Sequence, residues 1–172
     1  MTQTHPKSLS HFERDLSRSL ARRGKALLEA DDLTRQVSRM EPLEVYFMVK
    51  ELGLESAGPI LMCASADQLQ AFVDLDCWQG DQINFDDIDV WLAPFASLSP
   101  QALVAAFLSL EDQLQALYLR DALVIFQKVD EEIPTTGRKD VRNRLTSDGR
   151  FVIEPKEIDS EKEIDPLDLV AA

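Results

Sequence analysis

The chain has 172 residues, which suits one compact domain with a trailing segment, and 45% of them are apolar, enough to fill a core. Acidic residues outnumber basic ones by 31 to 18, and this excess argues against a general affinity for nucleic acid or anionic membranes, which bind positive surfaces. Two cysteines are too few for a disulfide framework, no apolar run approaches the roughly 18 residues of a membrane span, and the amino terminus lacks a secretory signal. The composition therefore predicts a cytoplasmic protein.

Charge is unevenly distributed along the chain. Residues 1–50 are slightly basic, whereas Glu51 to Leu119 hold 11 acidic residues and no lysine or arginine, and the remainder from Arg120 is mixed. An acidic central segment therefore lies between a basic leader and a mixed tail. This pattern favours an ordinary solvated surface. The alternatives are an acidic surface that meets a basic partner or divalent cations, and a leader that folds back onto the acidic face.

The first elements are a leader and a surface helix. Residues 1–15 are rich in serine and charge, with few apolar side chains, and we expect a flexible leader. From Leu16 onward leucines recur at helical spacing beside arginines, at Leu20, Leu27 and Leu28. This spacing predicts an amphipathic surface helix.

The centre of the chain carries signals for a series of short helices, beginning near positions 42, 56, 65, 84 and 99. Pro42 suits a first helical turn, and Gly53 suits a helix end. Ser65 with Gln68 forms a capping box. Further start signals are Asn84 with Asp87, and Ser99 with Pro100.

These signals predict an all-α fold over residues 16–129. Helices of two to four turns cannot bury a face alone, so we expect an irregular bundle or a short superhelical stack of short antiparallel helices. The leucines after Pro100 are spaced by alternating steps of four and three, which predicts the longest helical run. The pattern leaves open whether Ser109 and Leu110 interrupt it.

Residues 130–172 are expected to form a mostly extended, acidic tail. Asp148-Gly149 is a strong turn signal, and with the apolar residues that follow it predicts a small β-hairpin near residues 144–153. The apolar residues at the end of the chain, from Leu167 to Val170, favour a docking segment, or a chain that is one piece of a larger architecture.

No pattern of catalytic residues is present in the sequence. Cys63 and Cys77 lie in apolar helical runs, whereas the histidines, His5 and His11, lie in the leader, so nothing favours a Cys–His pair. There is no G-x-S-x-G elbow, and no glycine is placed as in a phosphate-binding loop. We therefore expect no catalytic residues and no cofactor.

An acidic cluster is the candidate metal site. Asp74-Leu-Asp76 followed by Gly80 and Asp81 is similar to a calcium loop, but the sixth and twelfth positions hold Gln79 and Phe85 where an EF-hand needs glycine and glutamate. A looser magnesium or calcium site stays as an alternative, with the candidate ligands Asp74, Asp76, Asp81, Asp86 and Asp87, and with Asp89 nearby. The simpler interpretation is that the acids at 86 and 87 stabilise a helix N-terminus, while the others face water.

Three segments together resemble an uncharacterised bacterial family of helical proteins. They are Glu44-Val-Tyr-Phe-Met-Val-Lys-Glu-Leu-Gly53, Asp74-Leu-Asp-Cys-Trp78 and Val90-Trp-Leu92, and Gly149-Arg-Phe-Val-Ile153 looks like that family's short strand after the helices. The resemblance spans about residues 40–153, the scale of one domain. It implies no known reaction or substrate. The series of short capped helices is also similar to the cytosolic amino-terminal domain of magnesium transporters, which is an architectural analogy without ligand residues.

Three function hypotheses follow. The first is a non-enzymatic cytoplasmic protein-interaction or regulatory module with an unidentified protein partner and no nucleic-acid or membrane partner. The second is a domain that responds to divalent cations through the acidic cluster. The third, an acid/base hydrolase using the same carboxylates, needs a cleft that a bundle of short helices rarely offers. The sequence leaves the partner and the oligomeric state open.

Overall fold

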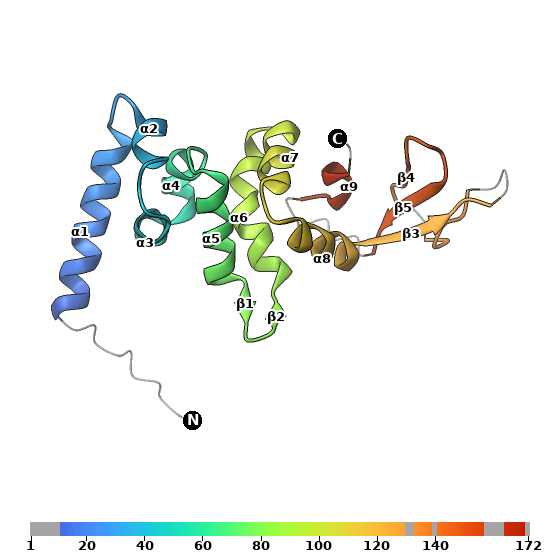
Figure 1. Ribbon diagram of the computed structural model, residues 1–172, viewed down its shortest axis with the longest axis horizontal. Helices are drawn as coiled ribbons and strands as arrows, with labels where there is room; N and C mark the ends of the chain where they lie inside the picture. The colour runs from blue at the N-terminus through green and yellow to red at the C-terminus, as the bar shows by residue number, and fades with distance from the viewer. Residues whose placement is uncertain (1–10, 130–132, 139–140, 157–163, 171–172) are drawn as a thin grey trace. The chain divides into compact units, whose positions relative to one another are not determined.

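The computed structural model describes residues 11–129, 133–138, 141–156 and 164–170 of the chain (Figure 1). These residues form nine helices and five strands, and most of them are helical. The chain divides into two compact units, unit 1 (Met1–Phe72) and unit 2 (Val73–Ala172), and the boundary falls within one helix, α5 (Ala66–Asp76). The all-α prediction is therefore correct for most of the described chain, but two small antiparallel sheets add to it.

Unit 1 is built from helices that pack through small and aliphatic residues. Its helices before α5 are α1 (His11–Leu28), α2 (Leu33–Val37), α3 (Pro42–Leu52) and α4 (Leu54–Leu61). Gly24 lets α1 approach α3 closely, because a Cβ atom at this position would lie 2.6 Å from Cδ1 of Leu52. Ser17 donates a hydrogen bond to Glu51, and Arg23 pairs with Glu44, so polar contacts flank the same helix pair.

The predicted caps of unit 1 are confirmed. Pro42 occupies the first turn of α3, and Gly53, with a φ of 78° that favours glycine, separates α3 from α4. In the capping box the Ser65 N–H donates to Gln68 Oε1 (2.9 Å), and the Gln68 N–H donates to Ser65 Oγ (3.2 Å). The Nε2 group of buried Gln68 also donates to the carbonyls of Val37 and Met40, both at 2.8 Å, and so ties α5 to the segment after α2.

Unit 2 continues with a short hairpin and three helices. The hairpin is β1 (Trp78–Gln79) with β2 (Gln82–Ile83), and the helices are α6 (Phe85–Leu98), α7 (Pro100–Leu108) and α8 (Asp112–Ala122). Asn84 and Ser99 cap α6 and α7 as predicted. The long leucine run is interrupted at Ser109, because α7 ends there and α8 starts three residues later. Buried Trp91, Leu92 and Phe107 belong to the core of this unit.

A three-stranded antiparallel sheet follows α8. Its strands are β3 (Leu123–Gln127), β4 (Arg144–Leu145) and β5 (Phe151–Pro155), in the order β3-β5-β4, and the last helix is α9 (Pro166–Leu169). The predicted hairpin near residues 144–153 is confirmed as β4 with β5, and Gly149 in the turn has a φ of 69°. Strand β3 corrects the all-α expectation, which placed these residues in the helical part of the chain.

The predicted division into a leader (1–15), a helical domain (16–129) and a tail (130–172) stays a prediction. Helix α1 begins at His11, inside the expected leader, and the expected tail holds β4, β5 and α9. Residues 1–10, 130–132, 139–140, 157–163 and 171–172 lie outside the described residues.

Candidate interaction surface

The acidic cluster is dispersed over unit 2, where its members serve the local structure. Asp76 accepts a hydrogen bond from Nε1 of Trp91 (3.1 Å), and Asp89 accepts one from the hydroxyl of Tyr118. Asp87 accepts a hydrogen bond from the side chain of Asn84 (2.7 Å). These contacts hold α5 to α6 and α6 to α8.

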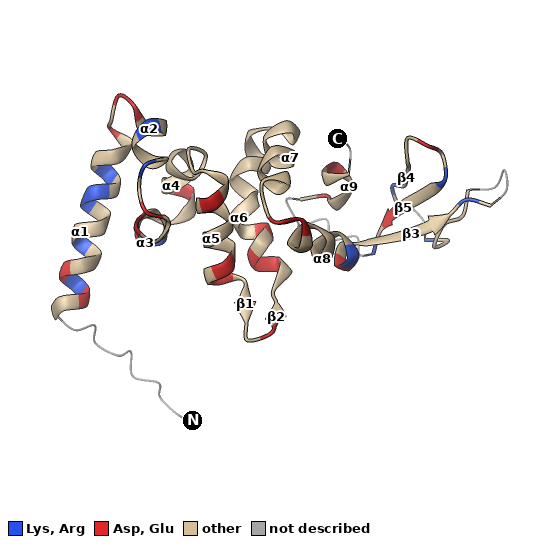
Figure 2. Ribbon diagram, in the orientation of Figure 1, with Lys and Arg blue, Asp and Glu red and all other residues tan. Residues whose placement is uncertain are grey.

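The remaining acids of the cluster lie in three different places. Asp86 is in the first turn of α6, Asp74 is near the end of α5, and Asp81 is in the turn between β1 and β2. Figure 2 shows acidic residues on α5 and α6 and basic residues on α1. Among the residues that the structure describes, no three His, Cys, Asp or Glu side chains are grouped so that they could hold a metal ion. The helix-start interpretation of Asp86 and Asp87 agrees with their position and with the cap at Asn84.

The hydroxyl of Tyr118 has a strongly raised pKa. Burial raises its pKa far above the ordinary value, and the carboxylate of Asp89, which accepts the hydroxyl proton's hydrogen bond, raises it further. Phe85 and Phe107 pack edge-on against the Tyr118 ring. The neutral hydroxyl, on a ring that packs against two other aromatic rings, is suited to joining α6 to α8. It is not suited to acid–base chemistry at neutral pH.

The cysteines and the described histidine also have structural neighbours. Sγ of Cys63 lies 3.2 Å from Oγ1 of Thr34, Cys77 is buried, and neither cysteine forms a disulfide. His11 pairs with Asp15 one turn along α1 (2.8 Å). His5 lies outside the described residues. The contacts of Cys63 and His11 are thus with threonine and aspartate, which do not form the pair that nucleophilic catalysis needs.

The register of the sheet defines its two faces. Ile125 lies directly opposite Ile153, Leu123 lies opposite Pro155, and Gln127 lies opposite Phe151. Because side chains alternate along a strand, these six residues share one face, which we call face A. The other face carries the side chains of Val124, Phe126, Val152 and Glu154.

The outer edge of β3 is one of the two edges of this sheet, and the outer edge of β4 is the other. The Lys128 N–H donates to the carbonyl of Arg150, and the Lys156 N–H donates to the carbonyl of Ala122, both at 2.8 Å. In an antiparallel pair such bonded positions recur at every second residue, so Val124 and Phe126 also direct their backbone groups toward β5. The backbone groups of Leu123, Ile125 and Gln127 therefore point away from β5. The Leu123 N–H caps the end of α8 at the Leu119 carbonyl. Within the described residues no hydrogen bond engages the backbone groups of Ile125 or Gln127.

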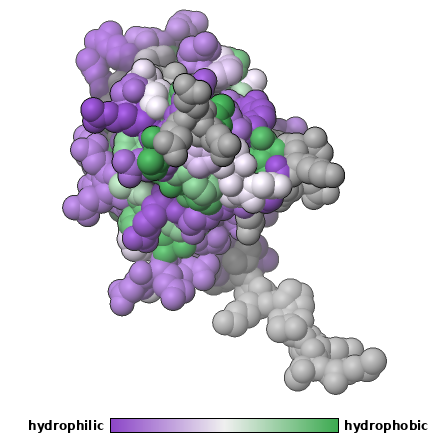
Figure 3. All heavy atoms as spheres, turned by 90° about the vertical axis from the view of Figure 1, so that its right-hand side faces the viewer, coloured by the Kyte–Doolittle hydropathy of each residue, from purple (hydrophilic) through white to green (hydrophobic). Residues whose placement is uncertain are grey.

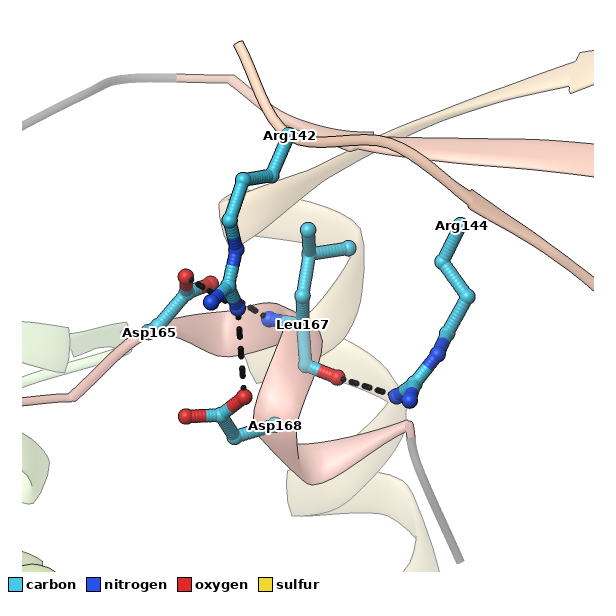
Figure 4. A network of polar contacts seen from close by, with 5 residues as sticks. All are labelled: Arg142, Arg144, Asp165, Leu167 and Asp168. Atoms are coloured by element: carbon cyan, nitrogen blue, oxygen red, sulfur yellow. Dashed lines mark hydrogen bonds and ion pairs between the residues drawn. The ribbon is translucent and has the colours of Figure 1, made fainter.

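Helix α9 covers one half of face A. Buried Leu167 packs with Leu123 and Ile153 in a small apolar cluster. Two arginines from the segment around β4 hold the helix in place (Figure 4). Arg142 bridges Asp165 (2.7 Å) and Asp168 (3.2 Å), while Nη1 of Arg144 donates to the Leu167 carbonyl (3.0 Å). The apolar residues from Leu167 to Val170 thus dock on the sheet of their own chain. This agrees with one of the two sequence predictions, that they form a docking segment.

The other half of face A is exposed, and it carries Ile125, Phe151 and the polar Gln127. Ile125 is 62% exposed, and Phe151 is 38% exposed. Val129, two residues after the end of β3, is 80% exposed. Figure 3 views the end of the molecule that carries this sheet, and apolar residues form separate patches there among polar ones. Exposed apolar side chains beside an unpaired strand edge are a typical template for adding another strand.

A polar contact covers part of the opposite face. Glu154 is buried, and its Oε2 accepts hydrogen bonds from the N–H (3.1 Å) and the hydroxyl (2.7 Å) of Thr136. The guanidinium of Arg138 donates to the carbonyls of Pro155 and Lys156. These contacts fix the segment around Thr136 against β5. Face A with the β3 edge is the candidate interaction surface, because exposed apolar side chains and outward backbone groups lie together there.

This surface was not predicted, although the sequence holds a signal for it. The residues Leu123-Val-Ile-Phe126 form a run of branched and aromatic residues, which favours a strand over the end of a helix.

Comparison with known proteins gives one match. A family model described as a family of unknown function (DUF6178) matches residues 3–167, and the chain belongs to this family. The predicted resemblance to an uncharacterised family over about residues 40–153 is confirmed at that level, while the bacterial origin and the analogy with magnesium transporters stay predictions. No curated protein and no solved structure matches the chain.

Within the described residues, no helix has the length and apolar character needed to cross a membrane.

Proposed function

We propose that this chain is a non-enzymatic protein-interaction module of the cytoplasm, and that it binds an extended segment of a partner protein as an added strand on β3. The observation that carries the proposal is the free edge of β3, where the backbone groups of Ile125 and Gln127 face outward beside an exposed apolar face. The cytoplasmic setting rests on composition and on two cysteines that are not joined in a disulfide.

Strand addition is the binding mode that this geometry favours. An added strand gains backbone hydrogen bonds from the outward groups, and its alternate side chains contact the exposed half of face A. Strand β3 contains no charged residue and no proline, the features by which proteins commonly protect a free strand edge from pairing. A segment with apolar side chains at every second position fits beside Ile125, the exposed apolar residue of β3 on face A.

The other two hypotheses have no comparable support. The described acids are dispersed over caps and helix contacts, which do not favour a cation site. The carboxylates of Asp76, Asp87 and Asp89 each accept a hydrogen bond from a neighbouring side chain, which does not favour a hydrolytic pair. We therefore put forward the interaction module alone.

The test blocks the edge without unfolding the sheet. The Gln127 N–H points away from β5, so Gln127→Pro removes an outward donor and leaves the β3–β5 hydrogen bonds in place. Ile125→Lys places a charge in the middle of the edge. Gln101→Lys, on the exposed surface of α7, is the matched control.

Partner proteins are captured on the immobilised full chain, and the amide exchange of Ile125 and Gln127 is followed with each recovered protein. We expect a partner that slows exchange at these two amides and that is lost with both edge variants but kept with Gln101→Lys. Recovered proteins that bind all three variants equally, or that leave both amides exchanging freely, would contradict the proposal.

A further inference from the structure

Strand β3 has the symmetry of a surface that pairs with itself. The outward-facing residues Leu123, Ile125 and Gln127 are evenly spaced about Ile125. A twofold axis perpendicular to the sheet, level with Ile125 and midway between the two strands, sets β3 antiparallel to β3 of a second chain. Ile125 then lies opposite its own copy, and Leu123 lies opposite the partner's Gln127. The outward groups of the two Ile125 residues face each other, which is the hydrogen-bonded arrangement of an antiparallel pair.

The distribution of charge favours a second copy of this chain, and not an unrelated strand, as the occupant of the β3 edge. Two chains that each carry a formal charge of −13 repel each other, so any contact between copies must avoid their acidic surfaces. The five residues of β3 are all uncharged, and the first charged residues on either side, Asp121 and Lys128, have opposite signs. Antiparallel pairing places the Asp121 end of one strand beside the Lys128 end of the other. The strand therefore brings two acidic chains together without setting like charges opposite one another along the pair.

The apolar face is continuous across such a pair. Ile125 and Phe151 lie on face A, and the twofold axis leaves face A of both sheets on the same side. The exposed Ile125 side chains of the two copies become cross-strand neighbours, so each covers part of the other. The buried area is limited by strands of five residues, which is small for an interface that holds chains together permanently.

We infer that the strand added to β3 is β3 of a second copy of this chain, and that the two three-stranded sheets join into one six-stranded sheet in a reversible homodimer. The inference rests on the proposed function, because it names the occupant of the same edge. Twofold dimers are the commonest assemblies of soluble proteins, and their interfaces are self-complementary in this way.

Sedimentation equilibrium of the full chain over about a hundredfold range of concentration measures the association. We expect the mass to rise from 19.4 kDa toward twice that value as concentration increases. Added salt should strengthen the dimer, because it screens the repulsion between the two acidic chains. Ile125→Lys and Gln127→Pro should each weaken the dimer by about tenfold or more. Gln101→Lys should leave it unchanged, and circular dichroism should show that all variants are folded.

A synthetic peptide with the sequence of residues 122–129 separates this inference from the function on which it rests. If the chain is a dimer through β3, the peptide competes with the second copy and lowers the mass. A chain that stays monomeric at every concentration but binds the peptide, with slowed amide exchange at Ile125 and Gln127, overturns the homodimer and retains strand addition. A monomer that does not bind the peptide overturns the homodimer, and the capture experiment with the two edge variants then decides strand addition by another protein. A dimer whose mass is the same in both edge variants also overturns the inference, because it uses another surface.

Discussion

Ile125 and Ile153 lie directly opposite each other in the sheet, yet 62% of Ile125 and only 8% of Ile153 is exposed. The difference arises from α9, because Leu167 packs against Ile153 and Leu123. One pair of identical residues thus marks the border between the part of face A that serves folding and the part that is free for binding. Substitution of the two residues separates these roles.

Ile153→Ala should lower the free energy of unfolding by about 2–5 kcal/mol, because it leaves a cavity beneath α9. Ile125→Ala should change it by only about 0.5 kcal/mol or less, because the side chain already faces water. Urea denaturation of the two variants measures both values at protein concentrations where the wild-type chain is monomeric. Equal losses at the two positions would mean that Ile125 is buried in solution.

The attachment of α9 should depend on apolar packing more than on its ion pairs. Arg142 is 63% exposed, and exposed ion pairs contribute about 0–1 kcal/mol, so Arg142→Gln should have a small effect that disappears in high salt. Leu167→Ala removes a buried side chain and should cost about 2–5 kcal/mol at any salt concentration. Amide exchange in β5 reports detachment of the helix. Faster exchange with Arg142→Gln than with Leu167→Ala would contradict this order.

The starts of several helices were predictable, because helix capping depends on residues that are close together in the sequence. Ser65, Asn84 and Ser99 cap the helices that they were expected to cap, because a cap needs only residues within one turn of sequence. Strand β3 was missed because its partner β5 lies more than twenty residues away along the chain, and no local pattern fixes that pairing. The apolar residues from Leu167 to Val170 favoured either a docking segment or one piece of a larger architecture, and their contacts with Leu123 and Ile153 arise only in the folded sheet.

The candidate site illustrates the same limit. The acidic residues are close together in sequence, which suggested a cation site. The structure uses Asp76 and Asp89 on different helices to accept hydrogen bonds from Trp91 and Tyr118. Nearness in sequence therefore did not become nearness in space. The edge of β3, by contrast, depends on which backbone groups point away from β5. The side-chain sequence indicates this only weakly.

Gln68 should be the most sensitive polar residue of unit 1. Gln68→Leu keeps a side chain of similar size but leaves the carbonyls of Val37 and Met40 without their donor, so we expect a loss of about 2–4 kcal/mol. Gln36→Leu, on the exposed side of α2, is the matched control and should change stability by about 0.5 kcal/mol or less. Thermal unfolding by circular dichroism measures both variants. Equal effects would show that the buried hydrogen bonds of Gln68 add nothing to stability.

Magnesium and calcium should not stabilise the chain specifically. Asp76 and Asp87 accept hydrogen bonds from neighbouring side chains, and within the described residues no acidic group is arranged to hold a cation. We therefore expect no saturable rise in Tm when either cation is compared with a chelator at matched ionic strength. A saturable rise that Asp74→Ala or Asp81→Ala abolishes would restore the cation hypothesis.

Tyr118 should make the chain sensitive to alkali. Its pKa in the folded chain is raised by burial and by Asp89, whereas in the unfolded chain it titrates near the ordinary value of 10.0. Above about pH 10 the unfolded chain loses a proton that the folded chain retains, so the free energy of unfolding falls as pH rises, by about 1.4 kcal/mol per pH unit. Below that pH both states hold the proton, and Tyr118 adds no pH dependence.

Tyr118→Phe isolates this effect, because it removes the titrating hydroxyl and keeps the ring between Phe85 and Phe107. We expect the variant to be less stable than the wild-type chain at neutral pH by about 1 kcal/mol, since the hydrogen bond to Asp89 is lost. Above about pH 10 its stability should fall less steeply, so the two chains converge. Urea denaturation across this pH range measures the convergence, and the tyrosinate absorbance of the folded wild-type chain should show one of its two tyrosines resisting ionisation. Parallel stability curves for the two chains would mean that Tyr118 ionises as easily when folded as when unfolded.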